Sequence, residues 1–119
     1  MKIYKDSTTP VLAAVSSVKV TNFVWNYVAI SFSSTTLKPT FYKALVTDDA
    51  LPPGEEYTGI ASTFAPSCTS LTSNFIGKAN NREENNDFNL AAALNDLKIF
   101  NTSLSFDQLK ANFLAEKSI

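Results

Sequence analysis

The chain has 119 residues, a net charge of −1 and an apolar fraction of 45%, which suits one globular domain. The near-neutral charge argues against nucleic acid or an anionic membrane surface as a partner. Because there is no histidine and one cysteine, Cys68, the sequence excludes a Ser-His-Asp triad, an intrachain disulfide and a cysteine zinc cluster. No apolar run approaches the roughly 20 residues of a membrane helix, so we expect no membrane insertion.

Alternating residues predict short strands from the N-terminus onward, at 2–6, 10–15 and 17–22. The clearest strand covers 24–33 and has one wholly apolar face and one mixed face. Val28, Ile30 and Phe32 point to the apolar face, and Trp25, Tyr27, Ala29 and Ser31 point to the mixed face. Such a strand is expected to be central in its sheet, with one face on the core and the other partly covered.

The middle of the chain alternates between turn signals and further strand patterns. Residues 33–39 predict a turn, because Ser and Thr hydroxyls bond local backbone groups and Pro39 cannot donate to a ladder. A strand is expected at 40–46, a loop rich in Asp, Pro and Gly at 47–56, and a weaker strand at 57–64.

The C-terminal part is predicted to contain two more strands and a helix. A short strand is expected at 74–78 and a polar loop at 79–87. Residues 90–100 also admit a helix, since Ala and Leu are good helix formers, but alternation around Leu97 and Ile99 favours a strand, in which Phe100 would be buried.

A helix is predicted directly after that strand. Ser105 and Gln108 are spaced as a capping box, and Leu104 and Leu109 are placed as a hydrophobic staple. Leu109 and Phe113 form an apolar stripe, to which Leu114 is a further candidate. Because isolated helices shorter than about 12–15 residues are marginal, the stripe must dock on a sheet. One helix after many short strands predicts an all-β sandwich or jelly roll.

Three segments resemble the laminin-G-like, concanavalin A-like jelly-roll domains of the lectin-glucanase class. LNDLKIFNTSLS (94–105) is similar to the family's I-D-D-V-R-I-Y-N strand and its A-L-S connection. VWNYVAISFSSTTLKPTFY is similar to the W-H-H-V-A-V-T-Y-D-G strand and its successor, and SNFIGKAN to the L-Y-I-G-G-N strand. The matches span roughly 23–113, with Ala92 where the family has glycine and Asn95 where it has aspartate.

The resemblance implies an all-β antiparallel sandwich (jelly roll) with a short C-terminal helix, in which residues 1–119 form a single partial domain. The family has further strands before the point where this chain begins, and they pair with the last strand. We therefore expect the domain to be incomplete at its N-terminal side, with an open edge on the strand at 94–100.

The resemblance also implies a function without catalysis. The E-x-D-x-x-E strand of glycosidases on this sandwich is absent from the sequence. The leading hypothesis is an extracellular or cell-surface recognition or adhesion module that binds a glycan or glycoprotein. The alternative is a structural subunit of an extracellular or filamentous assembly, in which an open sheet edge pairs with other copies or chains.

Candidate site residues lie in two polar loops. Amide and carboxylate side chains could bind sugar hydroxyls, and the ligand-binding candidates are Asp48, Asp49, Asn80, Asn81, Glu83, Asn85, Asn86 and Asp87. Calcium, which prefers oxygen ligands, is a possible cofactor with Asp48, Asp49 and Asp87 as candidate ligands. The two loops would meet at one end of the sandwich if 57–64 is a strand. Solvated charged loops are the alternative.

Three other features bear on recognition and location. Trp25, Tyr27 and Tyr57 are candidates for stacking on a sugar ring, with ordinary packing as the alternative. Asn101 begins an Asn-Thr-Ser sequon for N-glycosylation, which agrees with an extracellular protein; a chance sequon in a chain rich in Asn, Ser and Thr is the alternative. Cys68 is either a free thiol or half of a bridge to residues outside this chain.

Overall fold

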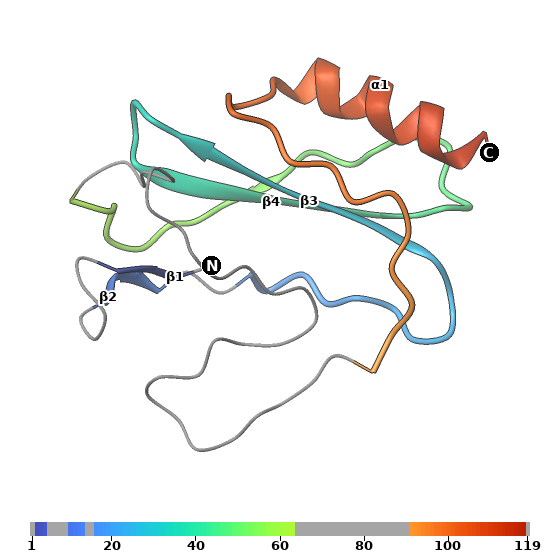
Figure 1. Ribbon diagram of the computed structural model, residues 1–119, viewed down its shortest axis with the longest axis horizontal. Helices are drawn as coiled ribbons and strands as arrows, with labels where there is room; N and C mark the ends of the chain where they lie inside the picture. Colours follow the sequence, from blue (N-terminus) through green and yellow to red (C-terminus); the bar gives the residue numbers. More distant parts are fainter. Residues whose placement is uncertain (1, 5–9, 14–15, 64–90, 119) are drawn as a thin grey trace.

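The computed structural model describes residues 2–4, 10–13, 16–63 and 91–118, which form two small antiparallel sheets and one helix (Figure 1). The strands are β1 (Lys2–Tyr4), β2 (Pro10–Ala13), β3 (Asn26–Ser33), β4 (Lys38–Leu45) and β5 (Glu55–Glu56), and the helix is α1 (Phe106–Lys117). β1 pairs with β2, and the larger sheet has the order β3-β4-β5. A mostly β fold with a three-stranded antiparallel sheet and a short C-terminal helix is thus confirmed.

β3 and β4 form the predicted hairpin around a turn at residues 34–37. The Leu37 amide donates to the Ser33 carbonyl at 2.8 Å, and the Ser33 hydroxyl accepts from the Thr36 amide at 3.1 Å. Leu37 closes the turn with φ 54°. The sequence predicted Pro39 in the turn, but the structure places Pro39 in β4. The Pro39 carbonyl accepts from the Tyr57 amide at 3.0 Å and therefore faces away from β3. The nitrogen of a strand residue faces the same side as its carbonyl, so the missing N–H of Pro39 costs no hydrogen bond between β3 and β4.

β5 reaches β4 because the chain can approach closely at Gly54. A Cβ there would lie 2.5 Å from both the Thr40 methyl carbon and the Tyr42 ring. β5 then pairs over two residues, Thr40 with Glu56 and Phe41 with Glu55. The larger sheet therefore ends, on this side, in a very short strand.

α1 begins as the sequence predicts. The Ser105 hydroxyl accepts from the Gln108 amide at 3.2 Å, and the Gln108 side chain accepts from the Ser105 amide at 2.8 Å. Asp107 lies in the first turn, where its charge suits the helix dipole, and pairs with Lys110 at 2.6 Å. The capping box and the helix that follows it are confirmed.

The core lies between α1 and the near face of the larger sheet. Its buried side chains are Ala44, Leu51, Leu109 and Phe113. The Phe113 ring meets the Tyr27 ring edge-to-face, with centroids 5.4 Å apart, and the Tyr42 and Phe106 rings stack at 6.0 Å. The helix stripe therefore consists of Leu109 and Phe113, while Leu114 is half-exposed.

Among the described residues, the environment of β3 differs from the predicted one in two respects. Among the described strands β3 is at the edge of its sheet, not at its centre. Its mixed face, with Tyr27 and Ala29, packs on the core, whereas Val28 and Ile30 on the apolar face are 60% and 57% exposed. The aromatic ring of Tyr27 fills the space under Phe113, and the register with Ala44 leaves room for it.

The strands predicted at 17–22 and 57–64 are also wrong over the residues that the structure describes. At 17–22, the backbone N–H and C=O of Thr21 bond the side chain of Asn26 instead of a neighbouring strand. At 57–63, the structure has no strand: the Tyr57 amide donates to the Pro39 carbonyl in β4, and the Ser62 amide donates to the Leu37 carbonyl in the turn.

The strand predicted at 90–100 is irregular over its described residues, 91–100. Asp96 has φ 51°, a left-handed conformation that interrupts an extended backbone. Leu97 and Ile99 are exposed, and Phe100 is 49% exposed instead of buried. The predictions for residues 64–90, including the strand at 74–78, lie outside the described residues.

Candidate functional site

The outer edge of β3 is the most distinctive surface of the described chain. The Trp25 carbonyl accepts from the Val46 amide, while the Leu45 amide is bonded by the Asp48 carboxylate instead of β3. Bonded pairs alternate along an antiparallel ladder, so Tyr27, Ala29 and Ser31 share bonds with β4. The backbone groups of Val28 and Ile30 therefore point away from β4, toward the edge that no other described strand pairs with.

The sequence of β3 has none of the features that usually protect an edge strand from pairing. β3 is eight residues long (NYVAISFS) and contains no charged residue, proline or glycine. Exposed edges are normally shortened, charged or interrupted by proline or a bulge. The β3–β4 register runs without a bulge from Asn26 to Ser33. Outward backbone groups and an uncharged strand without a bulge together form a template for another strand.

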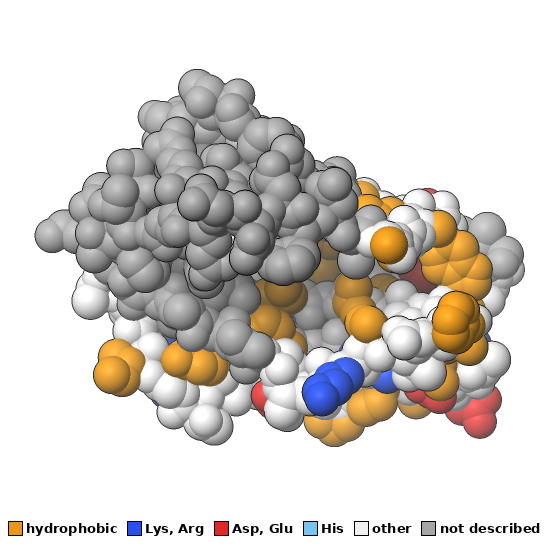
Figure 2. All heavy atoms as spheres, turned by 90° about the horizontal axis from the view of Figure 1, so that it is seen from below, with side chains coloured by type: hydrophobic (Ala, Val, Ile, Leu, Met, Phe, Trp, Pro, Cys, Tyr) orange, Lys and Arg blue, Asp and Glu red, His pale blue; other side chains and the backbone are white. Residues whose placement is uncertain are grey.

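Apolar side chains accompany the open edge on the face away from α1. Figure 2 views the molecule from this side, and hydrophobic atoms are visible on the part drawn in colour. Val28 and Ile30 are more than half-exposed there, and Ile30 stands opposite Phe41 in the register. Large exposed apolar patches mark interaction sites more often than isolated apolar residues do.

A second exposed feature is the turn just before β3. The side-chain amide of Asn26 accepts from the Thr21 amide at 2.9 Å and donates to the Thr21 and Val24 carbonyls at 2.8 Å each. Within this clamp, Phe23 has φ 63° and a fully exposed ring. The sequence signal for this clamp is Asn26, near the start of the predicted strand at 24–33, and its role was not predicted.

The candidate aromatics are placed differently from one another. Trp25 is 54% exposed beside the clamped turn. Tyr27 packs against Phe113. Burial raises the pKa of the Tyr27 hydroxyl, and the nearby Glu116 carboxylate raises it further. Tyr57 is half-buried and lies against its own loop, since a Cβ on Gly59 would be 2.2 Å from the Tyr57 hydroxyl. Of the three, Trp25 has the ring available for stacking.

Of the predicted polar-loop candidates, the structure describes Asp48 and Asp49. The Asp48 Oδ2 accepts from the Leu45 amide at 2.8 Å, so this carboxylate caps the end of β4. The Asp48 carbonyl also accepts from Lys117. Asp49 is exposed. Asn80, Asn81, Glu83, Asn85, Asn86 and Asp87 lie outside the described residues, as does Cys68.

The described ranges hold no cluster of three His, Cys, Asp or Glu side chains that could bind a metal ion. Asp48 is engaged with backbone, and Glu55 accepts hydrogen bonds from the Ser17 amide and hydroxyl, which lower its pKa. The calcium prediction, which also involves Asp87, stays a prediction.

The sequon lies on the surface. Asn101 is exposed in the segment that leads to α1. The Ser103 hydroxyl is 2.6 Å from the Ser31 hydroxyl, and Ser31 also donates to the Leu104 carbonyl at 3.4 Å. These contacts hold the segment against the α1 side of β3 without a backbone bond to β3 among the described contacts.

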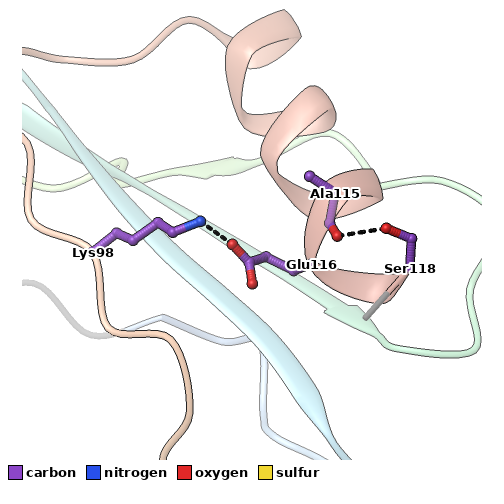
Figure 3. Close-up of polar contacts among 4 residues, drawn as sticks. All are labelled: Lys98, Ala115, Glu116 and Ser118. Atoms are coloured by element: carbon purple, nitrogen blue, oxygen red, sulfur yellow. Dashed lines mark hydrogen bonds and ion pairs between the residues drawn. The ribbon is translucent and has the colours of Figure 1, made fainter.

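Lys98 links this segment to α1. Its ammonium pairs with the Glu116 carboxylate, and Figure 3 shows the side chain reaching across β3 to the helix. The hydrogen bond with Lys98 lowers the pKa of Glu116, and the same bond raises the pKa of Lys98. The pair therefore fastens residues near 98 over β3.

The ion pair predicts a pH dependence. A carboxyl group with a lowered pKa stabilises the fold above its unfolded pKa, and this contribution is lost as the pH falls through the folded pKa. The stability difference between the wild type and Glu116→Gln should therefore be present near neutral pH and vanish in acid. Titration of the Glu116 carboxyl by NMR checks the cause, since Lys98→Met should return its pKa toward the ordinary value. An unchanged pKa in Lys98→Met would contradict the assignment.

No protein-family model, curated protein or solved structure matches the chain. In the part of the chain that the structure describes, α1 is too short and polar to cross a bilayer. The described residues therefore define a small β-rich fold in which no other described strand pairs with the outer edge of β3, next to a turn with exposed aromatic residues.

Proposed function

We propose that the chain is a non-catalytic structural subunit that assembles with other copies by adding a strand at the edge of β3. The observation that carries this proposal is the outward direction of the Val28 and Ile30 backbone groups on a long, uncharged edge strand. In strand addition, main-chain hydrogen bonds supply affinity and alternate side chains supply specificity.

The side chains favour the same association. Val28 and Ile30 are both more than half-exposed and lie on one face of β3. A strand added beside them would cover part of this apolar surface while it bonds the open backbone. Full burial of one such side chain is worth about 1.5–3 kcal/mol, so two of them give a real driving force.

Replacing Ile30 by lysine tests the proposal. A charge on an edge strand opposes pairing, and the apolar contact is lost as well. We expect Ile30→Lys to weaken self-association by roughly 10–100-fold, the equivalent of losing about 1.5–3 kcal/mol. Sedimentation velocity over a concentration series gives the dissociation constant directly.

Ile60→Lys is the matched control, because Ile60 is 88% exposed and lies outside the strands. It makes the same chemical change and should leave association unaltered. A wild-type chain that stays monomeric at every concentration overturns the proposed function, as does equal weakening by both variants.

The laminin-G-like sandwich and the extracellular location belong to the same proposal. A second sheet would pack on the face of β3 away from α1, and the exposure of Val28 and Ile30 on that face supports this. The exposed Asn101 sequon supports secretion. Expression in a secreting eukaryotic cell tests the location: loss of a glycan mass in Asn101→Gln is the expected result, and an unglycosylated wild type would contradict it.

Glycan recognition is a second candidate function, favoured by the exposed Trp25 beside a turn that the Asn26 side chain clamps with three hydrogen bonds. A preorganised ring lowers the entropic cost of stacking on a sugar. Trp25 is the one tryptophan of the chain, so its fluorescence reports on this site alone. A glycan-array hit that quenches this fluorescence, and that Phe23→Ala weakens, supports the candidate; no hit with or without calcium removes it.

A further inference from the structure

The two edges of the larger sheet are not equivalent. β5 is two residues long, and both are glutamates, Glu55 and Glu56. Glu55 is also held by Ser16, through its hydroxyl at 3.2 Å, and by the Ser17 hydroxyl at 2.9 Å. A short, charged edge resists strand addition. The β5 edge is therefore protected, whereas the β3 edge has no partner strand among the described residues.

This asymmetry restricts how copies can assemble. A filament needs head-to-tail contacts, in which the β3 edge of one copy meets a different surface of the next. The β5 edge is not suited to that role. The contact that remains among the edges of this sheet is β3 with β3, which is isologous and closes after two copies.

We infer that two copies pair through β3 as a closed, antiparallel two-fold dimer with Ile30 on the axis. This inference rests on the proposed function and names its partner, a second copy of this chain. The result is a continuous six-stranded sheet of order β5-β4-β3-β3-β4-β5, with both α1 helices on one face.

The charge pattern of β3 agrees with self-pairing. When a strand pairs antiparallel with its own copy, each charge near the axis meets a like charge, which destabilises the pair. β3 carries no charge at all, so this penalty is absent. Lys43, which stands opposite Val28 in the register, lies on β4 and is one strand further from the axis.

The position of the two-fold axis follows from the residues of β3 whose backbone groups face the outer edge. Because Val28, Ile30 and Phe32 all direct their backbone groups to the open edge, each must pair with a residue of the same set. An axis at Ile30 places Ile30 opposite its own copy and Val28 opposite Phe32 of the partner. Every apolar side chain of this face then has an apolar partner, whereas an axis at Ala29 would place Asn26 opposite Phe32.

Disulfide trapping of the full chain tests the register. In a Cys68→Ser background, Ile30→Cys places two thiols on a bonded pair, whose Cα atoms lie about 5.5 Å apart, within disulfide range. Val28→Cys is the matched comparison, because the axis at Ile30 separates the two copies of residue 28 by roughly 14 Å along the strands. We expect a covalent dimer within minutes of mild oxidation for Ile30→Cys and none for Val28→Cys.

The outcomes separate the two proposals. Wild-type association that Ile30→Lys weakens, together with trapping at 30 but not at 28, supports the dimer. Association that continues beyond two copies, or trapping through Ala29→Cys in place of Ile30→Cys, overturns the inference while strand addition at β3 stands. A wild-type chain that never associates removes the proposed function itself.

Discussion

Phe113→Ala should lower the free energy of unfolding by about 3–5 kcal/mol, the usual cost of truncating a buried phenylalanine. Phe113 is 1% exposed and is the side chain through which α1 meets the sheet. Its ring packs edge-to-face on Tyr27, at 5.4 Å between centroids, so the substitution also removes an aromatic contact. Alanine would leave a cavity between the helix and β3.

Chemical denaturation of the purified variant measures this loss. Phe100→Ala is the matched control, because Phe100 is 49% exposed in an irregular segment and should cost less than about 1 kcal/mol. Equal losses in the two variants would contradict the described core. They would favour instead the sequence-based prediction, in which Phe100 is a buried strand residue.

Leu51→Ala should cost about 2–5 kcal/mol, although Leu51 lies in a loop rich in turn-forming residues. Its side chain is 3% exposed and joins Ala44, Leu109 and Phe113 in the core. Leu51 therefore fastens the segment between β4 and β5 under the helix. The substitution is expected to loosen this segment as well as to destabilise the fold.

Leu114→Ala provides the comparison for Leu51, since it removes the same atoms from a side chain that is 50% exposed. Thermal unfolding followed by circular dichroism measures both variants. A midpoint shift for Leu114→Ala as large as that for Leu51→Ala would show that the helix presents a different face to the sheet.

Local sequence signals predicted the helix and the hairpin well. The capping box depends on the spacing of Ser105 and Gln108, and this spacing alone fixes where α1 begins. The turn between β3 and β4 likewise depends on neighbouring residues such as Ser33 and Thr36. Interactions between residues a few positions apart can be deduced from sequence, because both partners appear in the same short stretch.

The burial of β3 could not be deduced in the same way. Alternation shows that Val28 and Ile30 share a face and that Tyr27 and Ala29 share the other. It does not show which face a distant helix will cover. The stripe of α1, some eighty residues after β3, packs on Tyr27 and Ala44, so the core lies on the less apolar face of β3.

The strand predicted at 94–100 does not form, for a related reason. Its alternation around Leu97 and Ile99 suits a strand, but a strand forms only where a neighbour supplies hydrogen bonds. In the described chain, contacts of side chains hold the region instead, through Lys98 with Glu116 and Ser103 with Ser31. The open edge was consequently predicted on the wrong strand, and the candidate site on β3 emerged only from the topology.

Amide hydrogen exchange of β3, measured residue by residue at low and high protein concentration, tests the central claim most directly. The account predicts that the amides of Tyr27 and Ala29, which bond β4, are protected at both concentrations. The amides of Val28 and Ile30 should exchange rapidly in dilute solution and become protected as the concentration rises. Protection of Val28 and Ile30 that does not change with concentration would contradict assembly through this edge.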